Sequence, residues 1–171
     1  MQNHFDLFQL PQQFAIDAAA LDKAYREVQN QVHPDKFVSG TDAEKRVAMQ
    51  WATRANEGYK TLRSPLRRAS YLCELNGIDL QIESNTAMPM AFLMQQMEWR
   101  EALDAARTKR DIAALEQLDA ELKKALQIAL GEIGADFERH DYDSAGLGVR
   151  KLMFLDKLNE EIARYYDALD D

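Results

Sequence analysis

The sequence has very little of the material from which covalent and cofactor sites are built. It contains one cysteine, Cys73, among 171 residues. One cysteine forms neither an internal disulfide nor an iron–sulfur cluster site, which usually takes four thiolates. No apolar run approaches the ~18 residues of a membrane span, and the first residues lack the basic and apolar stretches of a secretory signal. We therefore expect a cytoplasmic protein with no cofactor and no membrane segment.

The sequence motifs of common enzyme classes are absent as well. The chain has no G-x-S-x-G, no P-loop, no Rossmann glycine pattern and no H-E-x-x-H motif. The Gly-Leu-Gly at 146–148 is too short for a phosphate loop and begins a helix. His33 has no second ligand at helical spacing, and His4 and His140 are distant in sequence, which disfavours a zinc site. We expect neither catalytic activity nor a bound metal.

Positive charge is scarce in the second half of the chain. Residues 76–171 hold eleven Lys and Arg against twenty Asp and Glu, whereas residues 1–75 hold ten against nine, and the whole chain has a net charge of −8. Nucleic-acid binding needs a basic footprint, so no nucleic-acid partner is expected. The uneven charge indicates two modules with different partners.

Helical periodicity dominates what is present, and no strand-like alternation accompanies it. Asp17 is placed to cap one long helix, and Thr41–Glu44 has the capping-box pattern that opens a second. Ser64-Pro65 indicates the start of a further helix, and Asn76-Gly77 indicates its end. The first 76 residues therefore predict a short first helix, a long helical pair and a following helix. The expected apolar stripe of the second long helix is Val47, Trp51, Ala55, Tyr59 and Leu62.

The periodicity breaks at residues 77–87, which we interpret as a linker. Three helical stretches follow, near residues 89–107, 110–138 and 144–169. Short connections between such helices favour an antiparallel bundle. The predicted fold is all-α, with a helical hairpin module at 1–76 and a three-helix bundle at 88–171.

Six residues, Val32-His33-Pro34-Asp35-Lys36-Phe37, separate the two long helices of the first module. Proline pushes the preceding residue out of the α region and so ends a helix, and aspartate is common in turns. The segment is therefore compatible with ordinary helix punctuation. Its place at the tip of an amphipathic hairpin also suits a binding site. Proline fixes the backbone there, while His33 and Asp35 offer a hydrogen-bonding group and a charge.

The first module resembles the J-domain family over roughly residues 3–75. The resemblance rests on the Phe5 to Pro11 segment, on "LDKAYREVQNQVHPDKF" and on "ANEGYKTLRSPLRRASYL". It implies that His33, Pro34 and Asp35 dock on an ATPase chaperone of the DnaK class and stimulate its ATP hydrolysis. Lys36 also matches the family, and we expect Lys23, Arg26 and Lys36 to be the cations that flank the docking loop.

The helix before the loop differs from that of general-purpose J-domains, which is rich in Lys and Arg. Here Asp22 and Glu27 dilute the charge of Lys23 and Arg26. Fewer cations predict weaker electrostatic steering and a narrower choice of chaperone. The alternative is that both cations belong to an ordinary solvated face.

The stretch "MPMAFLMQQMEWREALDAAR" at 88–107 predicts a helix that is apolar on two faces at about 100° per residue. The expected core face carries Phe92, Trp99, Leu103 and Ala106. The opposite face carries Met90, Leu93, Met94 and Met97, bordered by Glu98, Glu101 and Asp104. Unpaired carboxylates are almost never buried, so an adaptable methionine-rich binding surface is favoured. The alternative is that Met94 and Met97 pack against the first module.

The whole chain resembles the HscB-type iron–sulfur cluster co-chaperones, through the order of its modules and through "AFLMQQMEWREALD" and "VRKLMFLDKL". The resemblance implies that the bundle binds an IscU-type scaffold protein and that the J-domain delivers it to an HscA-type ATPase chaperone. The family has leucine where this chain has Met97, a volume-conserving difference. The client-binding residues that the resemblance implies are Leu93, Met94, Met97, Glu98, Arg100, Glu101 and Phe154. A J-domain co-chaperone with a different client stays open.

Overall fold

The computed structural model describes residues 2–80 and 88–169, and every regular element in these ranges is a helix. The all-α prediction is therefore confirmed for the described part of the chain. The chain divides into two compact units, Met1–Leu75 and Asn76–Asp171, and each is described by itself. No helix in the described ranges is long and apolar enough to cross a membrane.

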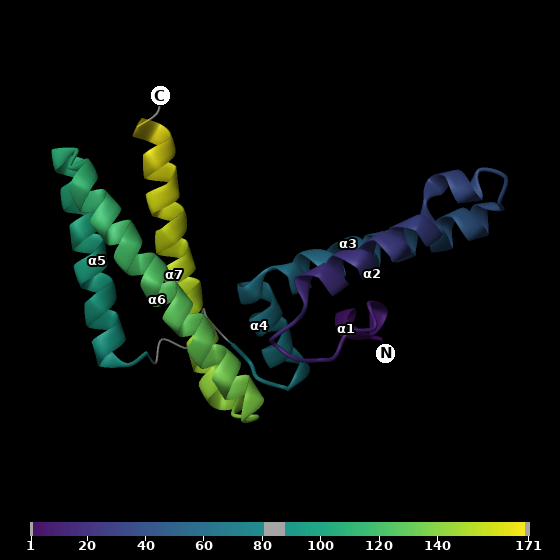
Figure 1. The fold of residues 1–171 in the computed structure, drawn as a ribbon, viewed down its shortest axis with the longest axis horizontal. Coiled ribbons are helices and arrows are strands. Elements are labelled where there is room, and N and C mark those ends of the chain that lie inside the picture. The colour runs from purple at the N-terminus through teal and green to yellow at the C-terminus, as the bar shows by residue number, and fades with distance from the viewer. Residues whose placement is uncertain (1, 81–87, 170–171) are drawn as a thin grey trace. The chain divides into compact units, whose positions relative to one another are not determined.

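The first unit is a helical hairpin with two shorter helices packed at its base (Figure 1). Its elements are α1 (His4–Leu7), α2 (Ala18–Val32), the 3-10 helix η1 (Pro34–Phe37), α3 (Asp42–Arg63) and α4 (Pro65–Leu75). The predicted caps are present. The side chain of Asp17 accepts from the Ala19 amide at 3.0 Å, and Thr41 Oγ1 accepts from the Glu44 amide at 3.1 Å. Local capping chemistry thus decides where both long helices begin.

Aromatic contacts hold α2 against α3. The rings of Tyr25 and Tyr59 stack with centroids 4.1 Å apart, and the rings of Phe8 and Tyr25 form a T-shaped pair. The Tyr59 hydroxyl donates to Asp22 Oδ1 at 2.7 Å, and this hydrogen bond raises the pKa of Tyr59. A ring stack and a hydrogen bond between side chains therefore connect α2 to α3.

The predicted stripe of α3 is wrong at its first position. Val47 is 51% exposed, and the neighbouring Ala48 is buried in its place together with Ala55 and Leu62. Trp51 is half-buried, with the Arg54 guanidinium 4.9 Å above its ring. The buried stripe of α3 therefore begins at the small side chain of Ala48 and not at Val47.

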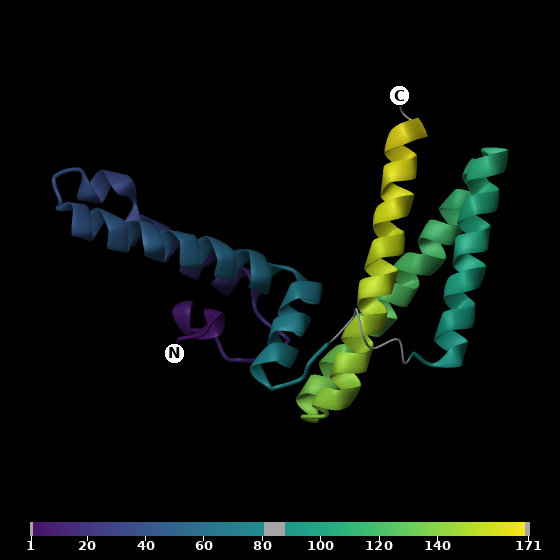
Figure 2. The same cartoon turned by 180° about the vertical axis from the view of Figure 1, so that it is seen from behind.

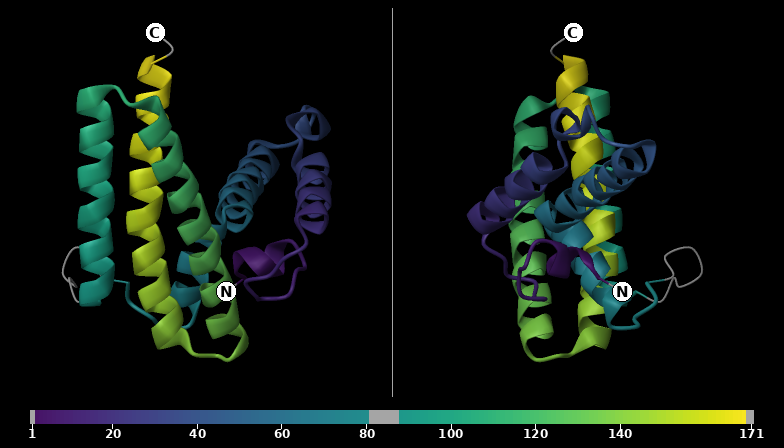
Figure 3. Two further views of the ribbon diagram at one scale, coloured as in Figure 1. Left: turned by 60° about the vertical axis from the view of Figure 1, so that its left-hand side comes forward. Right: turned by 90° about the vertical axis from the view of Figure 1, so that its right-hand side faces the viewer.

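The second unit is an antiparallel bundle of α5 (Met90–Lys109), α6 (Ile112–Glu138) and α7 (Tyr142–Leu169). Figure 2 and Figure 3 show the three helices side by side, with the α6–α7 pair continuing past the start of α5. The bundle predicted from the sequence is therefore confirmed. Its main core is formed by Trp99, Leu103, Ala106, Leu115, Leu118, Leu122, Leu155, Leu158 and Ile162.

The part of the α6–α7 pair that α5 does not cover has its own buried residues, Ile133, Phe137, Ala145, Val149 and Leu152. Residues that precede α5 pack here. A Cβ on Gly146 would lie 2.9 Å from Ile78 Cγ2 and 3.8 Å from Leu80 Cδ2. The beginning of the predicted linker, residues 77–80, therefore packs on α7. Residues 81–87 of that linker lie outside the described residues.

Two glycines of the bundle provide a matched test of helix packing. A Cβ on Gly148 would lie 2.8 Å from Ile133 Cγ1, whereas a Cβ on Gly131 would meet nothing within 4 Å. Gly131→Ala is expected to stabilise the chain by up to about 1 kcal/mol through helix propensity. Relative to it, Gly148→Ala is expected to lose about 1–3 kcal/mol to overpacking against the fully buried Ile133. Urea unfolding of both variants measures the difference, and equal stabilities would show that α6 can move away from α7 at little cost.

Candidate functional site

The first candidate surface is the tip of the hairpin, and its local geometry follows from the order His-Pro-Asp. His33 has φ −57° and ψ 135°, the extended conformation that a following proline imposes. His33 is therefore both the C-cap of α2 and the N-cap of η1. Pro34 occupies the first position of η1, where its missing N–H is not needed. One rigid bend thus ends one helix and begins the next.

The side chains of the tip point into solvent. The side chain of Asp35 is 86% exposed and that of His33 is 56% exposed. No residue of η1 is buried. The Asp35 carboxylate lies 3.5 Å from the ring of His33, and with 86% of the side chain exposed most of its surface can meet another molecule.

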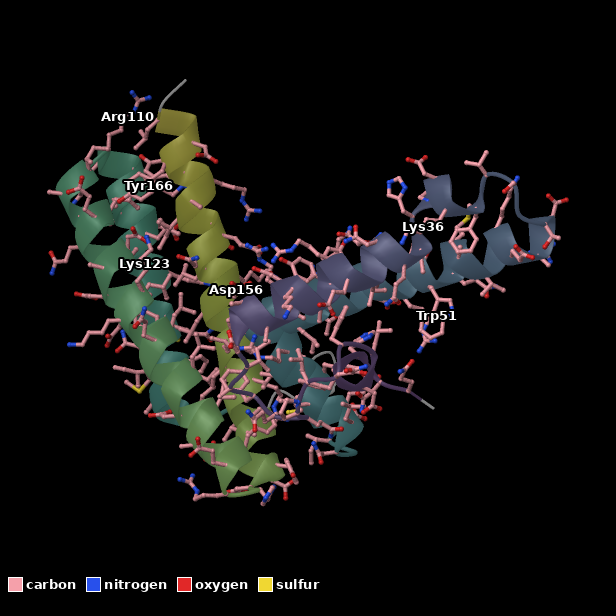
Figure 4. The ribbon with its side chains drawn as sticks, turned by 45° about the vertical axis from the view of Figure 1, so that its right-hand side comes forward. Lys36, Trp51, Arg110, Lys123, Asp156 and Tyr166 are labelled. Atoms are coloured by element: carbon pink, nitrogen blue, oxygen red, sulfur yellow. The ribbon has the colours of Figure 1, made fainter. Side chains whose placement is uncertain are left out.

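The three predicted flanking cations are exposed as well. Lys23 and Arg26 lie one turn apart on α2, and Lys36 lies on η1. None of the three makes a salt bridge within the described residues. Figure 4 shows Lys36 at the tip and Trp51 on the other side of the hairpin. The hairpin therefore has an exposed carboxylate at its tip, a cation beside it on η1 and two more on α2, and none of these cations is in a salt bridge within the described residues.

The second candidate surface is the solvent face of α5, here called the methionine face and consisting of Met90, Leu93, Met94 and Met97. Met90, Met94 and Met97 are 70%, 56% and 64% exposed, and Leu93 is half-buried. The opposite face of the same helix buries Trp99, Leu103 and Ala106, as predicted. The methionines are therefore not core residues of the bundle.

The charged residues assigned to this surface behave differently from one another. Glu98 and Glu101 are exposed. Arg100 instead pairs with Glu161 of α7, with 2.9 Å between Nη1 and Oε2. The Arg100 side chain is still 47% exposed. Its pairing therefore fixes α5 against α7 while leaving part of the guanidinium accessible.

Phe154 lies beside the core of the bundle. Its ring is half-buried and meets the ring of Phe92 at a centroid distance of 6.4 Å. Lys151 Nζ lies 5.9 Å above the same Phe92 ring. Phe154 of α7 therefore contacts the first turn of α5 through Phe92, the residue that precedes Leu93.

Sequence reasoning did not identify Glu161 as the partner of Arg100, or Phe92 and Lys151 as neighbours of the candidate surface. Opposite charges on two predicted helices give no signal of pairing until the helices are in register. For metals, no group of three or more His, Cys, Asp or Glu side chains that would suit an ion occurs within the described residues.

Comparison with known proteins finds relatives that match nearly the whole chain. Residues 88–163 match the family model described as the HSCB C-terminal oligomerisation domain. A Co-chaperone protein HscB homolog of Burkholderia vietnamiensis is 52% identical over 168 residues, which is 98% of this chain and 96% of the relative. The corresponding protein of Paraburkholderia xenovorans is 52% identical over 99% of this chain and 97% of its own length.

Solved structures agree. Chaperone HscB from Vibrio cholerae matches with a TM-score of 0.86 and 35% identity, covering 98% of this chain and 99% of that one. Human co-chaperone protein HscB matches with a TM-score of 0.90 and 29% identity, covering 95% and 81%. A helical hairpin with an exposed His-Pro-Asp tip, joined to a separate helical bundle, defines a co-chaperone of the J-domain class. Within that class, the chain belongs to the HscB family, whose members are co-chaperones and not enzymes.

Proposed function

We propose that this chain couples an IscU-type iron–sulfur scaffold protein to an HscA-type ATPase chaperone. In this proposal residues 1–76 contact the chaperone and residues 88–171 hold the client. The exposed His-Pro-Asp tip carries the first half of the proposal, because a carboxylate that is 86% exposed on a rigid bend is available to a partner. The exposed methionine face supports the second half of the proposal, in which the bundle binds the client.

The two candidate surfaces belong to different units of the chain, as an adaptor that binds two partners requires. The tip belongs to the unit Met1–Leu75 and the methionine face to the unit Asn76–Asp171. A few exposed apolar anchors supply most of the energy of a typical protein interface. Met94 and Met97 would supply these anchors, with Leu93 and Phe154 beside them. Glu98, Arg100 and Glu101 would form a charged rim that sets the rate and salt dependence of association.

The direct test uses the full chain, the purified chaperone and the purified scaffold protein. ATP hydrolysis by the chaperone is measured alone, with the chain, with the scaffold protein and with both. The proposal expects the chain to stimulate hydrolysis and the scaffold protein to increase that stimulation. Stimulation by the chain that the scaffold protein leaves unchanged would instead favour a J-domain co-chaperone with a different client.

Ionic strength should weaken chaperone docking, because salt screens interactions of exposed charges. Replacing Lys23 and Arg26 together by glutamine is expected to weaken docking at low salt by about 0.2–1 kcal/mol for each charge and to flatten the salt dependence. Chaperone ATPase stimulation over a salt series measures both effects. The matched control is Lys109→Gln with Lys124→Gln, which removes the same charge from exposed positions of the bundle. Identical salt curves for wild type and the Lys23/Arg26 variant would place docking away from this face.

A further inference from the structure

The methionine face holds most of the solvent-exposed sulfur of the described residues. The one thiol of the chain, that of Cys73, is buried in the first unit, and buried cysteines are inert towards oxidants in solution. The exposed thioethers of the described residues are those of Met49 on α3 and of Met90, Met94 and Met97 on α5. Sulfur that an oxidant can reach is therefore concentrated on the surface that we assign to the client.

We propose that Met94 and Met97 form a reversible oxidation site, and that conversion of their thioethers to sulfoxides releases the client from the bundle. The inference rests on the proposed binding of the client to the methionine face. Oxidation and repair both need side chains that solvent reaches, and these two are 56% and 64% exposed. Their spacing of three residues makes them neighbours on the helix surface, so both oxidations change the same part of the face.

The reaction needs an oxidant that delivers one oxygen atom, and a peroxide belongs to that class. A lone pair of the thioether sulfur attacks one oxygen of hydrogen peroxide, the O–O bond breaks, and a sulfoxide and one water are formed. The sulfur loses two electrons and the peroxide gains them. Methionine sulfoxide reductases reverse the step, with one enzyme for each sulfoxide epimer. In the reversal two thiols become a disulfide, and the sulfoxide oxygen leaves as water.

Oxidation changes what the two side chains offer to a partner. A thioether is apolar and adaptable, whereas a sulfoxide is polar and chiral. Its oxygen needs a hydrogen-bond donor once an interface buries it. The adjacent carboxylates, Glu98 and Glu101, are exposed and can only accept hydrogen bonds, and the Arg100 guanidinium is paired with Glu161. An interface that fits the thioethers should therefore lose affinity when they carry oxygen.

The test compares the full chain before and after treatment with hydrogen peroxide, which is removed before the scaffold protein is added. Peptide mass spectrometry measures the sulfoxide at each methionine, and calorimetric titration with the purified scaffold protein measures binding. Oxidation of both anchors is expected to weaken binding by about 25-fold or more, at about fivefold or more for each lost hot spot. Treatment with methionine sulfoxide reductases and a dithiol should restore the affinity.

Leucine variants make the test specific, because leucine has nearly the volume of methionine and no sulfur. Met94→Leu with Met97→Leu should bind the scaffold protein equally well before and after peroxide. Met49→Leu is the matched control, since Met49 is 70% exposed but lies on α3 of the first unit, and it should stay as sensitive to peroxide as wild type. Thermal denaturation should be the same for oxidised and untreated wild type, because exposed side chains contribute little to stability.

Two results would overturn the inference and leave the proposed function intact. One is unchanged binding by wild type that carries sulfoxides at Met94 and Met97. The other is an equal loss of binding, after peroxide, by the variant with leucine at both positions. Failure of untreated wild type to bind the scaffold protein would instead refute the proposed function and, with it, the release of that client by oxidation.

Discussion

Replacing Asp35 with asparagine is expected to abolish stimulation of the ATPase chaperone at the concentrations at which wild type stimulates it, while the fold stays intact. The side chain is 86% exposed and belongs to a 3-10 helix with no buried residue. Substitutions at such positions change the free energy of unfolding by about 0.5 kcal/mol or less. Removing one partner of a charge pair that becomes buried in a complex costs about 2–5 kcal/mol of binding free energy. The effect on docking should therefore greatly exceed the effect on stability.

Steady-state ATP hydrolysis by the chaperone, titrated with wild type and with Asp35→Asn, measures the effect. Asp42→Asn is the matched control, since Asp42 is an exposed carboxylate in the first turn of α3 on the same hairpin. It should stimulate as wild type does. Full stimulation by Asp35→Asn would show that the carboxylate is not what the chaperone recognises.

The double substitution Met94→Ala with Met97→Ala is expected to weaken binding of the scaffold protein by about 1 kcal/mol or more for each truncated anchor. Its effect on stability should be small, because the two side chains are 56% and 64% exposed and exposed truncations usually stay within about 0.5 kcal/mol. Core truncations of the same size cost about 2–5 kcal/mol. Thermal denaturation and calorimetric titration of one double variant therefore distinguish a binding face from a core.

Two control substitutions make this test specific. Ile128→Ala removes an exposed apolar side chain, 53% exposed on α6, and should change neither stability nor binding by much. Leu122→Ala removes a fully buried side chain of α6 and should lower the melting temperature strongly. The family model that matches residues 88–163 is described as an oligomerisation domain, so sedimentation of each variant should accompany the titration. Unchanged scaffold binding with a loss of self-association would assign the methionine face to a second copy of the chain.

The sequence by itself determined the helices of this protein and most of their ends. Asp17, Thr41 and Asp111 cap α2, α3 and α6 through contacts with amides two to three residues away. Pro65 begins α4, and Gly77 with φ 75° follows its end. Such signals act within one turn of the chain, so a sequence contains them completely. The carboxylates that border the methionine face likewise indicated which of the two apolar sides of α5 is exposed, because unpaired carboxylates are almost never buried.

Only the tertiary structure decided how the helices meet. It buried Ala48 rather than Val47 on α3, paired Arg100 with Glu161, and put Gly148 rather than Gly131 at the close approach of α6 and α7. Each outcome depends on the crossing and register of two helices, which are set by interdigitating side chains from distant parts of the chain. The same holds for Ile78, which lies over Gly146. No local pattern records these distances, because they exist only once the two surfaces are packed together.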